Sequence, residues 1–201
     1  GMEACLGEME SRVGWMPIEK FEYDNSRNRC YEIRANWALY VDNYLEGFHI
    51  PFVHNDLNRT LDYDDYRTEI FDGGVLQIGI ARDGEPSFEI PEESPDFGLE
   101  VAAYYYWIYP GLMLNFYPWG LSVNLVLPLS VDRTRIEYYG FVWDKKFLGK
   151  GAGGDLDKVE EEDQFVVEST HRGVSSISYE RGRYSPSKEI GVHHFHQMIS
   201  S

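Results

Sequence analysis

The sequence has few cysteines, few basic residues and no long apolar run, and each shortage excludes a class of protein. Only Cys5 and Cys30 occur among the 201 residues, which is typical of a reducing cytoplasm and not of a disulfide framework. No apolar segment approaches the ~20 residues of a transmembrane helix. The N-terminus also lacks the basic and apolar regions of a signal peptide. We therefore expect a cytoplasmic protein that does not enter a membrane.

Basic residues are outnumbered, with 18 Lys and Arg against 34 Asp and Glu and a formal net charge of -16. A surface this acidic repels phosphate backbones and anionic lipids, so neither nucleic acid nor a membrane is an expected partner. The motifs G-x-S-x-G and C-x-x-C and a phosphate loop are all missing. Their absence argues against a hydrolase, a thiol oxidoreductase or a kinase.

What is abundant is aromatic residues, which make up 15% of the chain and favour strands and large apolar pockets. The turn residues between the aromatic segments predict six strands, at 66–71, 75–82, 101–109, 112–117, 122–129 and 134–143. Short strands that follow one another through tight turns indicate an antiparallel sheet. Tyr106, Asn115, Tyr117 and Asn124 on these strands are candidates to line a pocket.

Helices are predicted on both sides of the strand region. Residues 36–50 predict a helix that ends before Pro51, and residues 51–65 predict a loop. Two further helices are predicted over 155–172, closed by Gly173, and over about 186–199. Residues 1–20 are expected to form an irregular or loosely docked lead-in, and residues 21–201 one domain. The order of elements predicts an α+β fold with helices on one sheet.

Two histidines mark the first region that could carry chemistry. At 100° per residue, Asp42, Glu46 and His49 gather on the polar side of the first predicted helix. His54 follows beyond Pro51, where the chain must leave the helix. Two imidazoles across a broken helix end can converge on one metal ion. A solvated helix face remains the alternative, because a His pair at this spacing is often incidental.

The second region is the acidic helix predicted at 155–172. Asp163 falls within the apolar stripe of that helix, whereas Glu160, Glu161, Gln164 and Glu168 are predicted to point mostly away. A buried carboxylate needs a partner. A buried salt bridge or a protonated acid would satisfy it, and so would a metal ion held jointly with His49 and His54, which would keep open positions for dioxygen.

The motif NW-x4-DN-Y-x-E-x-F-H-x4-H at residues 36–54 resembles the metal-binding motif of the catalytic domain of Rieske ring-hydroxylating oxygenase α-subunits. Residues 161–173 and 183–199 resemble later segments of the same family, within the branches that are similar to choline monooxygenase and phenylpropionate dioxygenase. The resemblance implies a helix-grip fold of the StAR-related lipid-transfer type, a curved antiparallel sheet packed on a long helix. It also implies Fe(II) bound by His49, His54 and Asp163.

The resemblance further implies that Glu46 links the iron site to the Rieske cluster of a neighbouring subunit, and that the chain forms a homotrimer. A Rieske cluster needs two Cys and two His, yet neither cysteine has an adjacent histidine and all six histidines lie at residue 49 or beyond. We therefore expect no cluster in this chain and a separate Rieske ferredoxin-type protein as electron donor. The expected reaction is oxygenation of a small aromatic or apolar substrate by dioxygen.

Other interpretations remain beside this one. A ligand-binding module could keep the pocket and lose the redox chemistry, and the missing Rieske domain is its best support. Glu46-x-x-His49 and Glu168-x-x-His171 match the spacing of di-iron helix bundles, but a bundle needs two more Glu-bearing helices where strands are predicted. The cluster His193, His194 and His196 is expected to pack or to lie on the surface.

Overall fold

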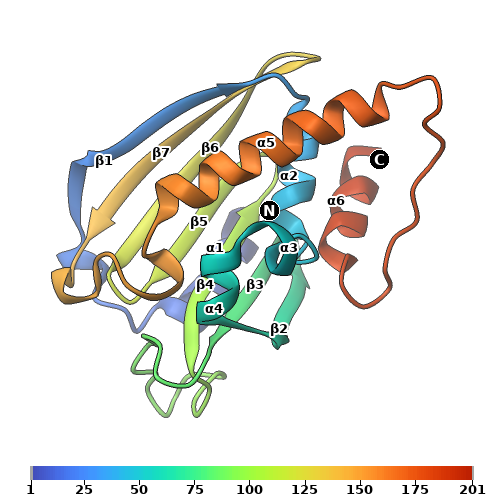
Figure 1. The fold of residues 1–201 in the computed structure, drawn as a ribbon. Helices are drawn as coiled ribbons and strands as arrows, with labels where there is room; N and C mark the ends of the chain where they lie inside the picture. The colour runs from blue at the N-terminus through green and yellow to red at the C-terminus, as the bar shows by residue number, and fades with distance from the viewer. Residues whose placement is uncertain (1, 201) are drawn as a thin grey trace.

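One curved antiparallel sheet of seven strands forms the body of the molecule (Figure 1). The computed structural model describes residues 2–200. The strands lie in the order β1-β7-β6-β5-β4-β3-β2. Their bounds are β1 (Glu22–Ile33), β2 (Leu61–Phe71), β3 (Gly74–Ala81), β4 (Val101–Ile108), β5 (Leu112–Tyr117), β6 (Gly120–Ser130) and β7 (Arg133–Val142).

All six predicted strands are present, and the turn chemistry explains why. The β2–β3 hairpin closes at Gly73, whose φ of 84° lies in the left-handed region that glycine adopts at no steric cost. Strand β1 was not predicted. It is an edge strand that pairs only with β7 and is mostly exposed or half-buried, so it does not show the apolar alternation that marked the others.

The helices are α1 (Met2–Val13), α2 (Trp37–Leu45), α3 (Ile50–Val53), α4 (Asn55–Thr60), α5 (Leu156–Val174) and α6 (Ile190–Ser200), with short 3-10 turns at Ile18–Lys20, Lys145–Phe147 and Gly151–Gly153. The long helix α5 runs across one face of the sheet, with α2 beneath it and α6 beside it (Figure 1). This is the helix-grip α+β arrangement that was predicted. None of the helices within residues 2–200 is long and apolar enough to cross a membrane.

The prediction of an irregular lead-in over residues 1–20 is wrong for most of that segment. Residues 2–13 form α1, and Val13 and Met16 are 1% and 4% exposed in a cluster on the outer face of the sheet. Arg12 donates to Asp96 at 2.8 Å, which ties this segment to the loop between β3 and β4. The segment is helical because it packs against the folded sheet, and this packing cannot be seen when the segment's sequence is considered alone. Residues 1 and 201 lie outside the described residues.

The predicted helix at 36–50 and the loop at 51–65 also need correction. Helix α2 starts at an Asn36 cap, which accepts from Ala38 N at 3.0 Å, and already ends at Leu45. Helices α3 and α4 and the start of β2 occupy most of the predicted loop. Pro51 is accommodated because it lies in the first turn of α3, where its missing N–H has no helical partner to lose. At the other end, α5 continues through Gly173, and α6 begins at Ile190.

The inner core joins α2, α5 and α6 to the sheet. Its members include Val41 of α2, Val167 of α5 and Phe195 of α6, exposed by 1% or less. The Phe195 ring lies edge-on to Trp107 of β4 at 5.2 Å and to Trp37 of α2 at 5.5 Å between centroids. Phe195 therefore attaches the C-terminal helix to the elements that carry the candidate site.

We predict that Phe195→Ala lowers the free energy of unfolding by about 3–5 kcal/mol, because it removes buried apolar contact and leaves a cavity. Urea denaturation followed by tryptophan fluorescence measures the loss. Ile199→Ala, on the same helix but 43% exposed, is the control and should change stability by less than about 0.5 kcal/mol. Equal effects of the two substitutions would contradict the assigned packing of α6.

Candidate metal centre and its pocket

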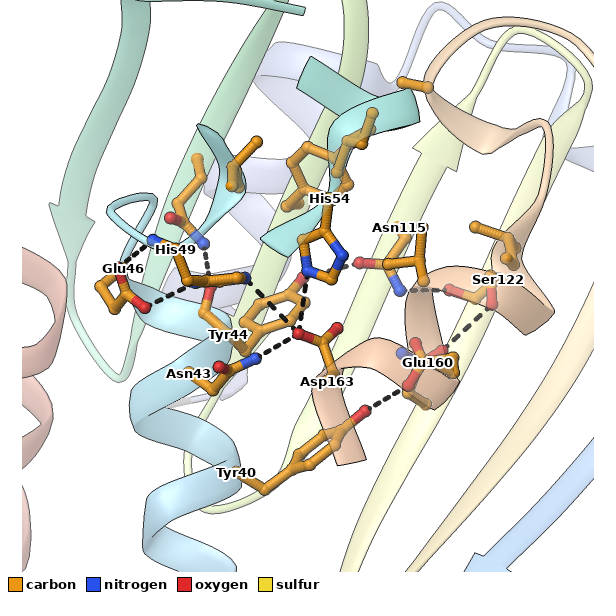
Figure 2. A pocket seen from close by; sticks show the side chains of 18 of the residues that line it. Tyr40, Asn43, Tyr44, Glu46, His49, His54, Asn115, Ser122, Glu160 and Asp163 are labelled. Carbon is orange, nitrogen blue, oxygen red and sulfur yellow. Dashed lines mark hydrogen bonds and ion pairs between the residues drawn. The ribbon is translucent and has the colours of Figure 1, made fainter. Parts of the chain in front are cut away.

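Three residues from separate elements meet at one point, and they are the three that the sequence predicted as ligands (Figure 2). His49 lies just before α3, His54 lies between α3 and α4, and Asp163 lies on α5. One donor atom from each lies within 4.8 Å of the others. Asp163 Oδ1 is 3.0 Å from His54 Nε2 and 3.5 Å from His49 Nε2.

The break between α2 and α3 brings the two histidines together. Glu46, after the end of α2, has extended backbone angles, so the chain leaves the helix axis there. Helix α3 is a single turn, and His54 closes it by donating its backbone N–H to Ile50 O at 3.1 Å. The two imidazole rings then lie 4.9 Å apart and nearly perpendicular. A continuous helix would place these residues on different faces.

A glutamate carboxylate contacts the Nδ1 atom of each imidazole ring. His49 Nδ1 lies 2.5 Å from Glu46 Oε1, and His54 Nδ1 lies 2.8 Å from Glu162 Oε2. An ionised carboxylate can only accept, so each Nδ1 carries a proton that it donates to its glutamate, and Nε2 is the ring nitrogen that faces Asp163. Metal-binding histidines are oriented in this way in other proteins.

The electrostatics of His54 show that the site favours positive charge. Its side chain is 1% exposed, and this burial opposes protonation. Hydrogen bonding to Asp163 and then to Glu162 outweighs burial and raises the pKa of the imidazole. Asn43 Nδ2 also donates to Asp163 Oδ1, at 2.6 Å. A proton on His54 therefore does part of what a cation at the centre of the group would do.

The donor set and spacing fit a transition-metal ion. Donors bound about 2.1 Å from one ion at right angles lie about 3 Å apart, close to the separation between His54 and Asp163. Two neutral imidazoles and one carboxylate also leave positions open on the ion. Among the residues whose side chains are described, one group of three or more side chains could hold a metal ion, and it consists of His49, His54 and Asp163.

The centre opens into a cavity of about 100 Å³ between α2, α5 and the sheet. Six tyrosines line it: Tyr40, Tyr44, Tyr66, Tyr105, Tyr117 and Tyr138. Asn115, Tyr117 and Asn124 were candidates from the sequence and do line it, whereas Tyr106 packs in the cluster on the outer face of the sheet. Adjacent strand residues point to opposite faces, which is why Tyr105 takes the place of Tyr106.

Glu160 corrects one prediction from the sequence. It was predicted to point away from the apolar face of α5, yet it lines the cavity, and its Oε2 accepts from Tyr40 at 2.8 Å and from Tyr138. On a helical wheel Glu160 lies only about 60° from Asp163, so the angle was the available signal. Glu162 was also not identified from the sequence, because its partner His54 is 108 residues away.

The remaining candidate clusters lie elsewhere. Glu168 accepts from the backbone N–H of Arg34 at 2.8 Å, in place of any role in a di-iron site. On α6, His196 Nε2 lies 2.8 Å from Asp42 and its Nδ1 lies 2.5 Å from Tyr184. These contacts join α6 to α2 and to the preceding loop, as the packing interpretation predicted.

Non-heme iron oxygenases bind their metal with two histidines and one carboxylate and leave coordination positions open. The site and fold of this chain fit that class of protein. The family comparison agrees, since the model for the ring hydroxylating alpha subunit (catalytic domain) matches residues 14–201. The chain belongs to this family, as its motifs indicated.

The sequence relatives include two kinds of monooxygenase. The chain is 35% identical to the chloroplastic choline monooxygenase of Arabidopsis thaliana over 180 residues, 85% of this chain and 40% of the relative. It is 29% identical to the carnitine monooxygenase oxygenase subunit of Escherichia coli K12 over 178 residues, 83% of this chain and 46% of the relative. The chain thus spans less than half the length of these relatives.

Solved structures share the fold. A quaternary ammonium Rieske monooxygenase in complex with L-carnitine aligns with a TM-score of 0.69 at 20% identity, covering 97% of this chain and 52% of that one. Naphthalene 1,2-dioxygenase from Rhodococcus sp. aligns with a TM-score of 0.60 at 16% identity, covering 86% of this chain and 54% of that one. At these identities the likeness establishes the helix-grip fold.

We predict that Glu162→Gln weakens metal affinity by about 10–100-fold, since it removes the charged acceptor that orients His54. Titration of the metal-free protein with Fe(II) under anaerobic conditions measures the affinity. Glu161→Gln, an exposed neighbour on α5 with the same change of charge, is the control and should leave it within about twofold. A similar loss in both variants would point to bulk charge and not to orientation of His54.

Proposed function

We propose that the chain is the iron-binding oxygenase component of a Rieske-type system, with Fe(II) held by His49, His54 and Asp163. The observation that carries the proposal is the convergence of these three donors in the wall of a tyrosine-lined cavity. Iron bound there would supply the reductive activation of dioxygen. The open positions that such a donor set leaves would face the cavity, where a small substrate can bind.

The protein's own residues prepare this site. Glu46 and Glu162 keep the protons of both imidazoles on Nδ1, and Asn43 fixes the Asp163 carboxylate. Tyrosines that are largely buried surround the cavity and limit its access to water; Tyr117 and Tyr138 are 4% and 6% exposed. A dry, rigid pocket protects a reactive centre from side reactions.

Glu46 has a second proposed role as the route for electrons. Its carboxylate contacts His49 through Nδ1 and is itself 17% exposed, so it joins the candidate centre to the surface. A separate Rieske ferredoxin-type protein would deliver electrons at this point, and a homotrimer would be the assembled form. The family resemblance supports both of these proposals.

We propose a small organic cation as substrate, which refines the expectation of an aromatic or apolar compound. The relatives named as choline and carnitine monooxygenases support an alkylammonium substrate. We also propose that one oxygen atom of dioxygen enters the product, because both of these relatives are named monooxygenases. A cytoplasmic location remains our proposal from the low cysteine content, although the Arabidopsis relative is chloroplastic.

The alternative of a ligand-binding module without chemistry has less support, because a bare pocket has no use for two histidines held in a metal-binding tautomer. Measurement of metal and of oxygen uptake separates the two functions. An oxygenase consumes oxygen when a Rieske protein, its reductase and a substrate are supplied. A binding module would bind the ligand and consume none.

We predict about one iron per chain in anaerobically purified or reconstituted protein, measured by elemental analysis. His49→Ala, His54→Ala and Asp163→Ala should each lose the iron, because each removes one of three ligands. His193→Ala, a histidine on α6 away from the site, is the control and should retain it. Iron absent from the reconstituted wild type, or unaffected by the three substitutions, would overturn the assignment.

A further inference from the structure

The tyrosine-lined cavity lies next to a groove that reaches the protein surface. The groove has a volume of about 400 Å³ and is lined by α4, the start of α5 and segment 149–154, which comes shortly before α5 in the chain (Figure 1). The groove and the cavity share three apolar lining residues, Leu57, Ala152 and Val159. These three side chains therefore form the partition between the groove and the cavity.

The partition is held by apolar contacts. Ala152 is buried, whereas Leu57 and Val159 are half-buried. Helix α4 contacts the turn Gly151–Gly153, and Leu57 packs against the apolar cluster that contains Ala152. Apolar contacts are non-directional, so Leu57 and Ala152 can separate without breaking a hydrogen bond between them.

The backbone of segment 149–154 is suited to movement. Four of its six residues are glycines, and Gly149 and Gly151 have φ angles of 72° and 62°, in the left-handed region that glycine adopts at no steric cost. Gly153 tethers the segment to the sheet, since its carbonyl oxygen accepts from Trp119 Nε1 at 3.2 Å. The segment is thus a glycine-rich strap with an anchor near its end.

A second groove lies on the other side of this segment. It has a volume of about 120 Å³, is lined in part by Gly153 and Gly154, and shares Ser122 and Leu156 with the cavity. Segment 149–154 therefore has space on both sides, and movement in either direction meets little close-packed structure.

The opposite wall of the cavity is closed by stacked rings. Tyr66 lies between Tyr63 and Tyr105, with 6.5 Å between ring centroids on each side. Lys188 Nζ lies 4.3 Å from the centroid of the Tyr63 ring and covers it from outside. Rings packed in this way cannot move apart easily, so this wall is a poor entrance.

We propose that segment 149–154 is a lid, and that a small substrate enters the cavity from the larger groove by passing between Leu57 and Ala152. Lys158 of α5 pairs with Asp56 of α4 across that groove, and both side chains are exposed. Exposed ion pairs are weak, so this one opens at little cost. When the lid closes, it limits the access of water to the candidate metal centre. The inference rests on the proposed function only in assigning a substrate to the cavity.

The test measures how fast a small reagent reaches the cavity. Asn124 lines the cavity and is 4% exposed, so Asn124→Cys places a thiol there, in a chain that also carries Cys5→Ser and Cys30→Ser. Methyl methanethiosulfonate transfers its methylthio group to the thiolate and releases methanesulfinate. Mass spectrometry follows the labelled fraction with time at several reagent concentrations.

We expect Leu57→Ala to speed labelling at least about tenfold, because it widens the passage. Leu57→Trp should slow labelling, since the groove has room for the larger ring beside the passage. Gly153→Ala should speed labelling, because the added Cβ would lie 2.4 Å from Trp119 Nε1 and displace the lid. Tyr63→Ala, on the opposite wall, is the control and should stay within about twofold of the parent.

Faster labelling of Tyr63→Ala with unchanged rates in the Leu57 and Gly153 variants would place the entrance on the opposite wall and overturn the lid. Equal rates in all folded variants would also overturn it. Thermal unfolding identifies a variant that is labelled because it unfolds, and all variants should react equally in urea.

Labelling requires neither turnover nor bound iron, and iron content is measured on the same samples. Normal iron content with labelling that ignores the lid substitutions rejects the lid and leaves the oxygenase proposal standing. Labelling that depends on Leu57 and Gly153 in protein that takes up no iron supports the lid and rejects the oxygenase proposal.

Discussion

The candidate site depends on how α5 packs across the sheet and against α2. Val167 of α5 and Val41 of α2 are buried in one core cluster, and burial of such apolar surface is the main force that holds the helices in place. That contact sets the position of Asp163, one turn earlier on α5, against histidines that lie more than 100 residues away in the chain. The same turn of helix carries Glu160 into the cavity and Glu162 against His54.

A second constraint comes from the concentration of acids. Glu46, Glu160, Glu162 and Asp163 all surround two imidazoles in a largely buried space. Like charges at such distances oppose one another, and neutral partners such as phenols offset only part of the cost. The arrangement is therefore suited to cations. The proposed iron would balance the charge of the acids that contact the two histidines.

Sequence-based prediction succeeded where the signal was local. Residues 112–117 form β5 as predicted, and Asp72, Gly73 and Gly74 gave the hairpin, because turn chemistry and aromatic strand preference act over a few residues. It failed for β1 and α1. The polar edge strand β1 gets its hydrogen bonds from β7, more than 100 residues later, and α1 is ordered by burial on the outer face. Neither partner is visible in a short window of sequence.

The candidate site divides in the same way. The motif from Asn36 to His54 by itself identified the two histidines and Glu46 as candidates, because their spacing is a local property of the sequence. The tertiary structure alone decided the environment of Glu160. Its angle on α5 permitted either direction, and only the folded sheet brings Tyr138 and Tyr40 to it from β7 and α2. Hydrogen bonding and charge within a cavity depend on which distant residues exclude water from it, and that is settled by packing of the whole chain.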